Sequence, residues 1–452
     1  MMQLPPTLKT PALLQVLNLV RDPLTFFDHH QAQQGDIFTS RVLGPGGPAV
    51  VFVGDPAGVE QIFTAPLDTF KLGQVTHVFR PLTGDRSLIC LDGTEHLRQR
   101  KLLMPPLHGQ RMQLYAQAIS QISLDVLATI PRDRPVTLRP YLAQITLQII
   151  LRVVFGLEPG PRAVELEQRI GAMLEAITQP LYSSCFFFSF LQQDWGAWSP
   201  WGHFVRQMGA IDALVYAEIR ERRAEFQADE QTSRTDVLSL LLMAEDEVGQ
   251  GMTDQELRDE LMTLLLLGHE TTASSLAWAF YWILSDSGIQ ERVRAELSKS
   301  AAGAPDVPSA GYLSAVCNET LRLYPIALIA QPRITKAAYK LGAYDCPPDT
   351  VLVPCIYLAH RRSEVFPQPL AFKPDRFLER TFSPHEFFPF GGGHRGCIGM
   401  AFSRFEMHLI LKTLLQAATW ELLPQTVQPV RRGITIVPSG GVKVKVGCAD
   451  LV

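Results

Sequence analysis

One cysteine of this 452-residue chain lies among residues that would make its sulfur reactive. Cys397 belongs to the segment Phe-Gly-Gly-Gly-His-Arg-Gly-Cys-Ile-Gly at 390–399. An ordinary thiol has a pKa of about 8.5, and only its thiolate binds metal strongly. Glycines let backbone N–H groups approach the sulfur, and the periodicity of 400–415 predicts a helix whose N-terminal end favours a nearby anion. The segment therefore predicts a thiolate-ligated haem, in which sulfur pushes electron density onto iron and favours O–O cleavage.

A simpler interpretation is that Cys397 is a buried structural thiol, as most single cysteines are. The residues around it argue against this interpretation. Three consecutive glycines and a nearby arginine do not suit a packed core. The segment resembles the haem-binding signature of the cytochrome P450 family, whose five positions are filled here by Phe390, Gly393, Arg395, Cys397 and Gly399. The resemblance implies a P450-like fold around a central haem b, with Cys397 as the iron ligand and Phe390, Arg395 and Gly399 in the cofactor loop. It covers nearly the whole chain and favours the soluble bacterial type.

The composition of the chain limits the classes of protein to which it can belong. The chain is 46% hydrophobic and 19% charged, as in globular proteins, and its net charge of −4 argues against nucleic acid as a partner. The seven cysteines are scattered without a C-x-x-C pair, which argues against a disulfide framework or a zinc site. The apolar stretch at 12–20 is shorter than the ~20 residues that span a bilayer. We therefore expect a cytoplasmic protein without a transmembrane anchor.

The pattern of elements predicts a mainly α protein with a small β-rich lobe. Helical periodicity dominates from about 55 to 323, whereas alternating apolar residues and turn signals mark about 35–55, 334–358 and 433–446 as strands. We expect a single haem-thiolate monooxygenase domain over 1–452, with the three β-rich segments forming the lobe.

The long apolar helix predicted for 254–285 contains Gly-His-Glu-Thr-Thr at 268–272. Glycine and β-branched residues are poor helix formers, so we expect the hydrogen-bond ladder to open here. Glu270 and Thr271 supply a carboxylate and a hydroxyl, which are parts of a proton relay, although threonine can also simply bond back to its helix. The family resemblance implies that both deliver protons to the oxygen site. Leu267 stands where the family usually has a small residue, and it would add an apolar wall that leaves the orientation of substrate open.

An acid and an arginine three residues apart occur at Glu95/Arg98, Glu291/Arg294 and Glu319/Arg322. The first two are predicted to be surface ion pairs. The third lies in an apolar helix, so we expect a buried pair that needs further hydrogen bonds. The resemblance implies that Glu319 and Arg322 lock with Arg376 to support the scaffold of the cysteine loop.

Haem carries two propionates, so several cations should converge on it. Single cations of this kind are usually ordinary surface residues, but the family places such residues at four positions that this chain fills. The four cations that the resemblance assigns to the propionates are His96, Arg100, Arg333 and Arg395.

The substrate is less clearly indicated. Residues 181–204 are densely aromatic, which fits either a hydrophobic core or a lid over a channel for an apolar ligand. We expect Phe187, Phe188 and Leu267 to line the substrate pocket. A lipophilic substrate such as a fatty acid, hydrocarbon or terpenoid, and a separate ferredoxin-type or flavoprotein electron donor, complete the expected monooxygenase.

Two other function classes remain open. One is a haem-thiolate peroxygenase or hydroperoxide isomerase, and such enzymes typically depart from the acid–threonine pair found here. The other is a non-catalytic haem-binding sensor, which would need neither a proton relay nor an aromatic channel. Turnover driven by reductant, compared with turnover driven by peroxide, separates these classes.

Overall fold

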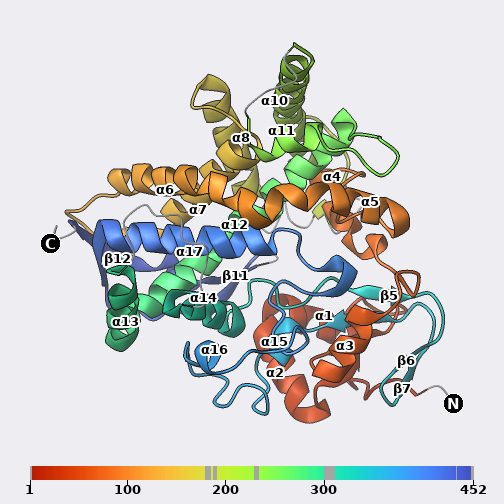
Figure 1. Cartoon of the computed structure of the whole chain (residues 1–452). Helices are drawn as coiled ribbons and strands as arrows, with labels where there is room; N and C mark the ends of the chain where they lie inside the picture. Colours follow the sequence, from red (N-terminus) through yellow and green to blue (C-terminus); the bar gives the residue numbers. More distant parts are fainter. Residues whose placement is uncertain are drawn as a thin grey trace. The chain divides into compact units, whose positions relative to one another are not determined.

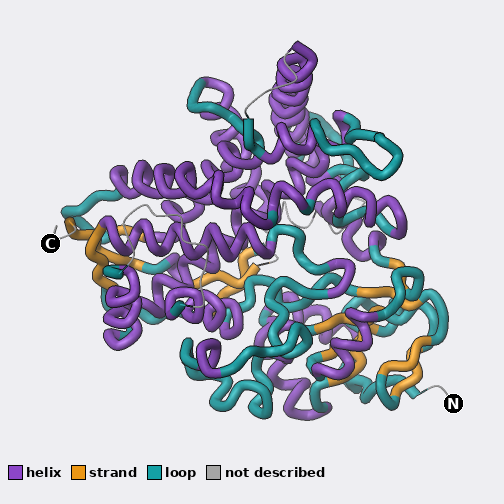
Figure 2. The backbone as a smooth tube through the Cα atoms, viewed as in Figure 1, coloured by secondary structure: helices purple, strands orange, loops and turns teal. Residues whose placement is uncertain are grey.

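A computed structural model describes residues 3–178, 185–186, 191–228, 234–299, 311–433 and 435–448. The chain divides into two compact units. Unit 1 comprises Met1–Val75, Ala310–Cys397 and Pro429–Val437, and unit 2 comprises Thr76–Ser309, Ile398–Gln428 and Pro438–Val452. Figure 2 shows that helix predominates and that strands are short, which confirms the predicted mainly α fold with small β-rich parts.

Unit 1 contains most of the strands. Its helices are α1 (Ala12–Arg21), α2 (Pro23–Gln34), α3 (Pro56–Thr64), α14 (Tyr312–Leu323), α15 (Ile356–Ala359) and α16 (Arg376–Glu379). Its strands are β1 (Ile37–Ser40), β2 (Val50–Val53), β3 (Phe70–Lys71), β5 (Arg333–Thr335), β6 (Tyr339–Leu341), β7 (Tyr344–Cys346), β8 (Val351–Pro354), β10 (Pro429–Arg432) and β11 (Thr435–Pro438).

A five-stranded sheet in the order β1-β2-β8-β5-β3 organises unit 1. Strand β2 is buried along its whole length because both faces of the sheet are covered. Successive side chains point to opposite faces. Val51 therefore packs with α3 residues such as Phe63 in one cluster, and Phe52 packs with α2 residues such as Phe27 in the other.

Unit 2 is mostly helical. Its helices are α4 (Arg80–Thr83), α5 (Gly93–Leu103), α6 (Met112–Thr129), α7 (Leu138–Ile149), α8 (Pro161–Thr178), α10 (Pro200–Ala228), α11 (Val237–Leu242), α12 (Asp254–Ser285), α13 (Ser287–Leu297) and α17 (Met400–Ala417). A π-helical turn at Ile150–Val154 continues α7, and β4 (Val136–Thr137), β12 (Lys443–Cys448) and β9 (Ala418–Leu422) form a three-stranded sheet in that order.

Helix α12 is the central helix of unit 2. It begins with a capping box in which Thr253 and Glu256 satisfy each other's backbone N–H groups. Most of its residues are buried, because α7, α10 and α17 all pack against it. Helices α6 and α17 also run side by side, as Figure 1 shows.

The β-rich segments are divided differently from the expectation. The segments 35–55 and 334–358 both contribute strands to the five-stranded sheet of unit 1. The segment 433–446 contributes β11, which pairs with β10, and β12, which pairs with β4 and β9 in unit 2. Within the described residues, no helix is long and apolar enough to cross a membrane.

Candidate functional site

The cysteine loop of unit 1 is a tight, internally bonded turn. The Gly391 N–H donates to the Phe388 carbonyl at 2.9 Å, and the Cys397 N–H donates to the Phe390 carbonyl at 2.8 Å. Gly391 and Gly393 have φ values of 66° and 63°, which favour glycine over other residues. The loop thus closes on itself immediately before the cysteine.

Two of the loop glycines are explained by the close approach of α3. A Cβ at Gly392 would lie 2.4 Å from the Phe63 ring, and a Cβ at Gly393 would lie 2.4 Å from the Phe63 carbonyl oxygen. The sequence suggested that glycines let N–H groups approach the sulfur. The packing shows that Gly392 and Gly393 are needed for a different reason, because any side chain there would push the loop away from α3.

Cys397 differs from the other described cysteines in its exposure. Its thiol is exposed, whereas Cys185, Cys317, Cys346 and Cys355 are buried. Burial raises the pKa of Cys346 to about 11 and that of Cys355 to about 12, which keeps both as inert thiols. Along the chain, Cys397 comes three residues before Met400, where α17 begins after the N-cap Gly399. Cys397 is therefore the accessible sulfur among these residues.

Two of the predicted propionate cations line one small pocket of unit 1. Arg333 is 4% exposed and Arg395 is 8% exposed, and both border this pocket together with His394. The remaining lining is largely apolar and comes from residues 62–72. Arg333 also donates to the Gln331 and Gly392 carbonyls. The pocket has a volume of about 10 Å³, room for roughly one water molecule, so it brings the two guanidinium groups together without itself enclosing a macrocycle. Paired guanidinium groups are suited to carboxylates such as the haem propionates.

The predicted buried ion cluster is assembled within unit 1. Glu319 and Arg322 are fully buried, and their carboxylate and guanidinium groups form a two-point contact at 2.6 and 2.8 Å. Arg376 joins through its Nε at 3.1 Å from the same carboxylate. Arg322 also donates to three backbone carbonyls, those of His360, Pro369 and Ala371. These extra bonds are what a buried charge cluster requires.

A histidine that sequence reasoning did not single out links this cluster to the cysteine loop. The His360 carbonyl accepts from Arg322, and its Nε2 accepts from the Phe388 N–H at 3.0 Å. Phe388 in turn accepts from Gly391 inside the loop. Burial lowers the pKa of His360 well below its ordinary value, and the charge of Arg322 acts in the same direction. The imidazole is therefore neutral, as a nitrogen that accepts a hydrogen bond must be.

Unit 2 carries the predicted oxygen-handling residues on α12. The expected opening of this helix is wrong, because α12 is continuous from Asp254 to Ser285. The Thr271 hydroxyl instead donates to the Leu267 carbonyl at 2.5 Å, which is the back-bonding that threonine often makes in helices. Gly268 lies in tight packing, since a Cβ there would lie 3.2 Å from Cδ1 of Ile150 in the π-helical turn.

The middle of α12 has an accessible face. Leu264, Leu267, Gly268 and Thr271 follow the i, i+3, i+4, i+7 spacing of one helix face, and all four are half-buried although most neighbouring residues are buried. The face combines two leucines with one hydroxyl. It can contact an apolar molecule and offer it a single polar group.

Glu270 has an ion-pair partner that the sequence analysis did not predict. Arg139, the second residue of α7, forms an ion pair with its carboxylate. The two side chains are 11% and 20% exposed, so the pair is screened less than a surface pair. The neighbouring His269 is buried, and the Thr146 hydroxyl lies 2.9 Å from its Nδ1. Helix α7 therefore orients both residues that precede Thr271.

A second carboxyl group lies near Thr272, the residue that follows Thr271 on α12. Glu406 of α17 is buried, and its hydrogen bond with Thr272 opposes the effect of burial. Burial nevertheless raises the pKa of Glu406 to about 8. Thr272 also lies 3.4 Å from the Ser403 hydroxyl. Glu406 is therefore mostly protonated at neutral pH and was missed because its surroundings come from a distant helix.

His96 and Arg100 lie one turn apart on α5, as predicted. His96 is 1% exposed and Arg100 is half-buried. Their assignment to the haem propionates stays a prediction. The predicted surface pair of Glu95 with Arg98 is wrong, because Arg98 instead pairs with Asp246 at 2.6 Å and Glu256 at 2.9 Å.

The predicted pocket residues Phe187 and Phe188 lie outside the described residues. Nearby, Phe186, Trp201 and Phe204 form a cluster with ring centroids 5.1–6.0 Å apart, of which Phe204 is buried. Trp195 and Trp198 stack on each other and are 59% and 79% exposed. The described part of the aromatic segment therefore combines core packing with exposed rings.

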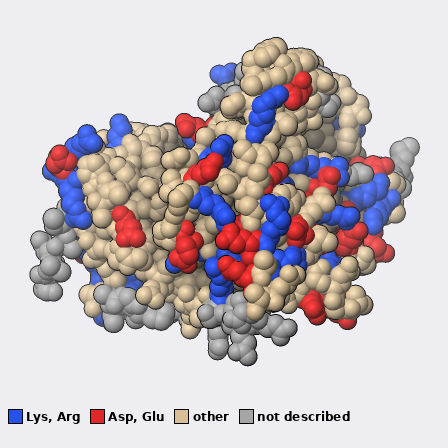
Figure 3. Space-filling view, turned by 90° about the horizontal axis from the view of Figure 1, so that it is seen from above, with Lys and Arg blue, Asp and Glu red and all other residues tan. Residues whose placement is uncertain are grey.

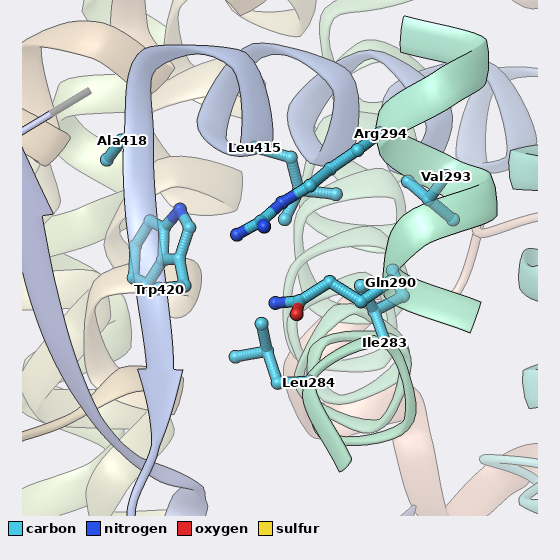
Figure 4. A pocket seen from close by; sticks show the side chains of 8 residues that line it. All are labelled: Ile283, Leu284, Gln290, Val293, Arg294, Leu415, Ala418 and Trp420. Carbon is cyan, nitrogen blue, oxygen red and sulfur yellow. The ribbon is translucent and has the colours of Figure 1, made fainter. Parts of the chain in front are cut away.

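A pocket of unit 2 contains none of the residues predicted for the functional site. It is lined by residues of α12, α13, α17 and β9, and Figure 4 shows Gln290 and Arg294 pointing toward Trp420. Its volume of about 10 Å³ has room for roughly one water molecule. On the face seen in Figure 3, basic and acidic side chains are interspersed. Neither feature marks a second site.

The fold and the cysteine loop define a haem-thiolate protein, and comparisons with known proteins give its family. The family model for cytochrome P450 matches residues 4–446, so the chain belongs to the cytochrome P450 family. It is 33% identical over 451 residues to cytochrome P450 135B1 of Mycobacterium tuberculosis, covering 98% of this chain and 92% of the relative. It is 35% identical over 414 residues to cytochrome P450 137 of the same species, covering 91% and 83%.

A solved structure extends the likeness to three dimensions. The retinoic acid-bound cyanobacterial CYP120A1 superposes with a TM-score of 0.84 at 26% identity, covering 99% of this chain and all of the other. The protein is thus a haem-dependent monooxygenase with iron protoporphyrin IX as its cofactor. The expected fold, enzyme class and cofactor are confirmed.

Proposed function

We propose that this cytochrome P450 hydroxylates a lipophilic substrate at an unactivated carbon, using dioxygen and electrons from a separate ferredoxin-type or flavoprotein donor. The observation that carries the proposal is the accessible face of α12, where Leu264 and Leu267 stand beside the Thr271 hydroxyl. Such a face favours contact with a hydrocarbon and leaves one polar group for proton transfer.

Cys397 is proposed as the residue that would hold the haem iron, and Arg333 and Arg395 as cations that would hold the haem propionates. The support is the exposed thiol and the shared pocket of the two arginines. When bound, haem supplies the activation of dioxygen that no amino-acid side chain can provide. The tight loop and the neutral His360 keep the sulfur in place.

Glu270 and Thr271 are proposed to move protons. Arg139 orients the carboxylate of Glu270 through its ion pair. The Thr271 hydroxyl already donates to the Leu267 carbonyl, so its oxygen lone pairs stay available to accept a hydrogen bond from another donor, such as a water molecule. The two side chains leave the continuous helix in different directions, so we infer that a water molecule carries the proton between them.

The lipophilic substrate class is supported by energetics and by a relative. Each CH₂ group that becomes buried contributes about 0.8 kcal/mol, so a chain of several CH₂ groups reaches micromolar affinity with few polar contacts. CYP120A1, which shares the fold, was solved with retinoic acid bound. Retinoic acid is an apolar chain with one carboxylate, which is consistent with a neutral or singly anionic substrate here.

A spectral screen tests the proposal. Fatty acids, terpenes and steroids are added to the purified haem protein, and displacement of water from the iron is read as a shift of the haem absorption band. We expect at least one hit, and we expect its hydroxylated product to form with reductant and a donor protein. Binding of only small, highly polar compounds would contradict the substrate class. Product formation with peroxide alone, and none with reductant, would identify a peroxygenase instead.

A further inference from the structure

Helix α7 and the π-helical turn that continues it contact three consecutive residues of α12 within unit 2. The contact pairs are Ile150 with Gly268, Thr146 with His269, and Arg139 with Glu270. Thr271, the next residue along α12, is half-buried on the accessible face of that helix. The residues proposed to move protons therefore belong to, or directly follow, the part of α12 that α7 holds.

The contact at His269 lies on the side of α12 opposite to Thr271. Consecutive helix residues are about 100° apart around the axis, so residues two positions apart leave the helix about 200° apart. His269 is buried on the side that faces α7, whereas Thr271 is accessible. A bond to His269 therefore sets the rotation of α12 about its own axis, and this rotation sets the direction of the Thr271 hydroxyl.

Thr146 holds His269 at two atoms. The Thr146 hydroxyl oxygen is fully buried and lies 2.9 Å from the His269 Nδ1 and 3.2 Å from the His269 carbonyl oxygen. A hydroxyl carries one hydrogen and two acceptor lone pairs, so it can accept from a protonated Nδ1 and donate to a carbonyl. The Ala143 carbonyl of the same helix, at 3.1 Å, is a second acceptor for this hydrogen. One hydroxyl thus contacts both the ring and the backbone of His269, and the backbone contact acts on the helix itself.

The neighbouring contact at Gly268 limits movement in the other direction. A Cβ at Gly268 would lie 3.2 Å from Cδ1 of Ile150, so little space separates α12 from the π-helical turn at this residue. Packing at Gly268 therefore resists closer approach of the two helices, while the hydrogen bonding at His269 resists their separation. Together the two contacts hold α12 at one distance from α7.

We propose that Thr146 is a positioning residue for proton transfer, because through His269 it fixes the rotation of α12 that directs the Thr271 hydroxyl. The inference rests on the proposed function of Thr271. With side chains a helix has a radius of about 5 Å, so a rotation of about 10° moves the tip of a side chain by about 1 Å. A misplacement of about 1 Å can lower a rate about a hundred-fold. A small rotation of α12 is therefore enough to impair proton transfer.

Thr146→Val tests the inference, because valine keeps the shape of threonine and removes the hydroxyl. In the haem-loaded full chain we expect the product formed per electron consumed to fall about three- to ten-fold, with the remaining electrons recovered as peroxide. Amide hydrogen exchange of peptides that cover 268–275 should become faster, because this part of α12 opens more easily. Thr146→Ser keeps the hydroxyl and should restore most of both readouts.

Thr413→Val is the matched control. Thr413 of α17 is 9% exposed, and its hydroxyl donates to the Ser120 hydroxyl of α6 at 3.4 Å, so it also connects two helices of unit 2. This change should leave the product ratio and the exchange of 268–275 unaltered. All of these variants should keep the carbon-monoxide spectrum of the wild type.

A double variant separates a positioning role from a general role in stability. If Thr146 acts through Thr271, Thr146→Val should cause no further loss once Thr271 is replaced by alanine, so the two effects should not add. Additive losses, or equal effects of Thr146→Val and Thr413→Val, would overturn the inference. A loss in Thr271→Ala without a loss in Thr146→Val would overturn this inference alone and leave the proposed function intact. No loss in Thr271→Ala would overturn the proposed role of Thr271, and with it any role of Thr146 in proton transfer.

Discussion

The cysteine loop of unit 1 and the middle of α12 in unit 2 are held in opposite ways. The loop is backed by a fully buried cluster of Glu319 and Arg322, which connects to it through His360 and Phe388. The α12 segment instead leaves Thr271 half-buried and orients Glu270 by one ion pair that is partly accessible. A metal ligand needs one fixed position, whereas groups that pass protons must exchange partners. The difference in burial is consistent with the tasks proposed for Cys397 and for Glu270 and Thr271.

Of these changes, replacement of Cys397, the proposed iron ligand, should have the largest effect on the haem spectrum. Cys397→Ala or Cys397→His should abolish the red-shifted carbon-monoxide band of thiolate ligation, because Cys397 is the exposed one among the cysteines whose burial the structure describes, and burial raises the thiol pKa of Cys346 and Cys355. Cys90→Ala, which replaces a half-buried cysteine of unit 2, is the control and should keep the band. A surviving band in the Cys397 variants would show that the ligand is wrongly assigned.

The second prediction concerns the buried ion cluster of Glu319, Arg322 and Arg376 behind the cysteine loop. Glu319→Gln removes the carboxylate and leaves the buried charges of Arg322 and Arg376 without their acid, which should cost about 3–5 kcal/mol of stability. Thermal denaturation and the proportion of thiolate-type carbon-monoxide band measure it. Glu95→Gln is the matched control, because its carboxylate is 64% exposed and lies 3.7 Å from Arg86. The control should change stability by less than about 0.5 kcal/mol. Equal effects of the two changes would contradict the structural role of the cluster.

The two regions also differ in how far the sequence predicted them. The loop could be recognised because its residues are adjacent, and Glu319 and Arg322 share one helix face. Arg376 was placed with them only through the family resemblance, since no local pattern joins residues 57 positions apart. His360 was missed because an accepting nitrogen leaves no trace in sequence spacing.

The prediction for α12 gave the helix bounds correctly and the local geometry incorrectly. Poor helix formers at 268–272 indicated an opening, but α12 is continuous, and the close approach of Ile150 in the π-helical turn leaves little room for a side chain at 268. The preceding helix α7 supplies Arg139 to Glu270. Propensity is a local quantity, and it cannot anticipate a neighbour that comes from 130 residues earlier in the chain.

A smaller effect is expected for the proton-handling hydroxyl. Thr271→Ala should keep haem and substrate binding but lower the product formed per electron consumed, on the order of ten-fold, with the lost electrons recovered as peroxide. Thr271→Ser should restore much of the ratio because it keeps the hydroxyl. Ser275→Ala, which removes a hydroxyl bonded to the Thr271 carbonyl at 3.0 Å, is the control and should have little effect. An unchanged ratio in Thr271→Ala would leave this residue with a structural role only.

The smallest effect concerns pH and the histidine behind the loop. Burial, with the charge of Arg322, lowers the pKa of His360 well below its ordinary value of 6.5. As pH falls through about 6.5, the unfolded chain binds a proton that the folded chain excludes, so stability is full above this pH and declines below it, by up to about 1.4 kcal/mol per pH unit. His360→Asn removes this titration, and the fall of its Tm between about pH 7 and pH 5 should be shallower than in the wild type. The same change at the exposed His77 should leave the slope unaltered. If His360→Asn follows the wild-type slope, the acid sensitivity of the fold arises elsewhere, and the imidazole is not the neutral acceptor that connects the ion cluster to the cysteine loop.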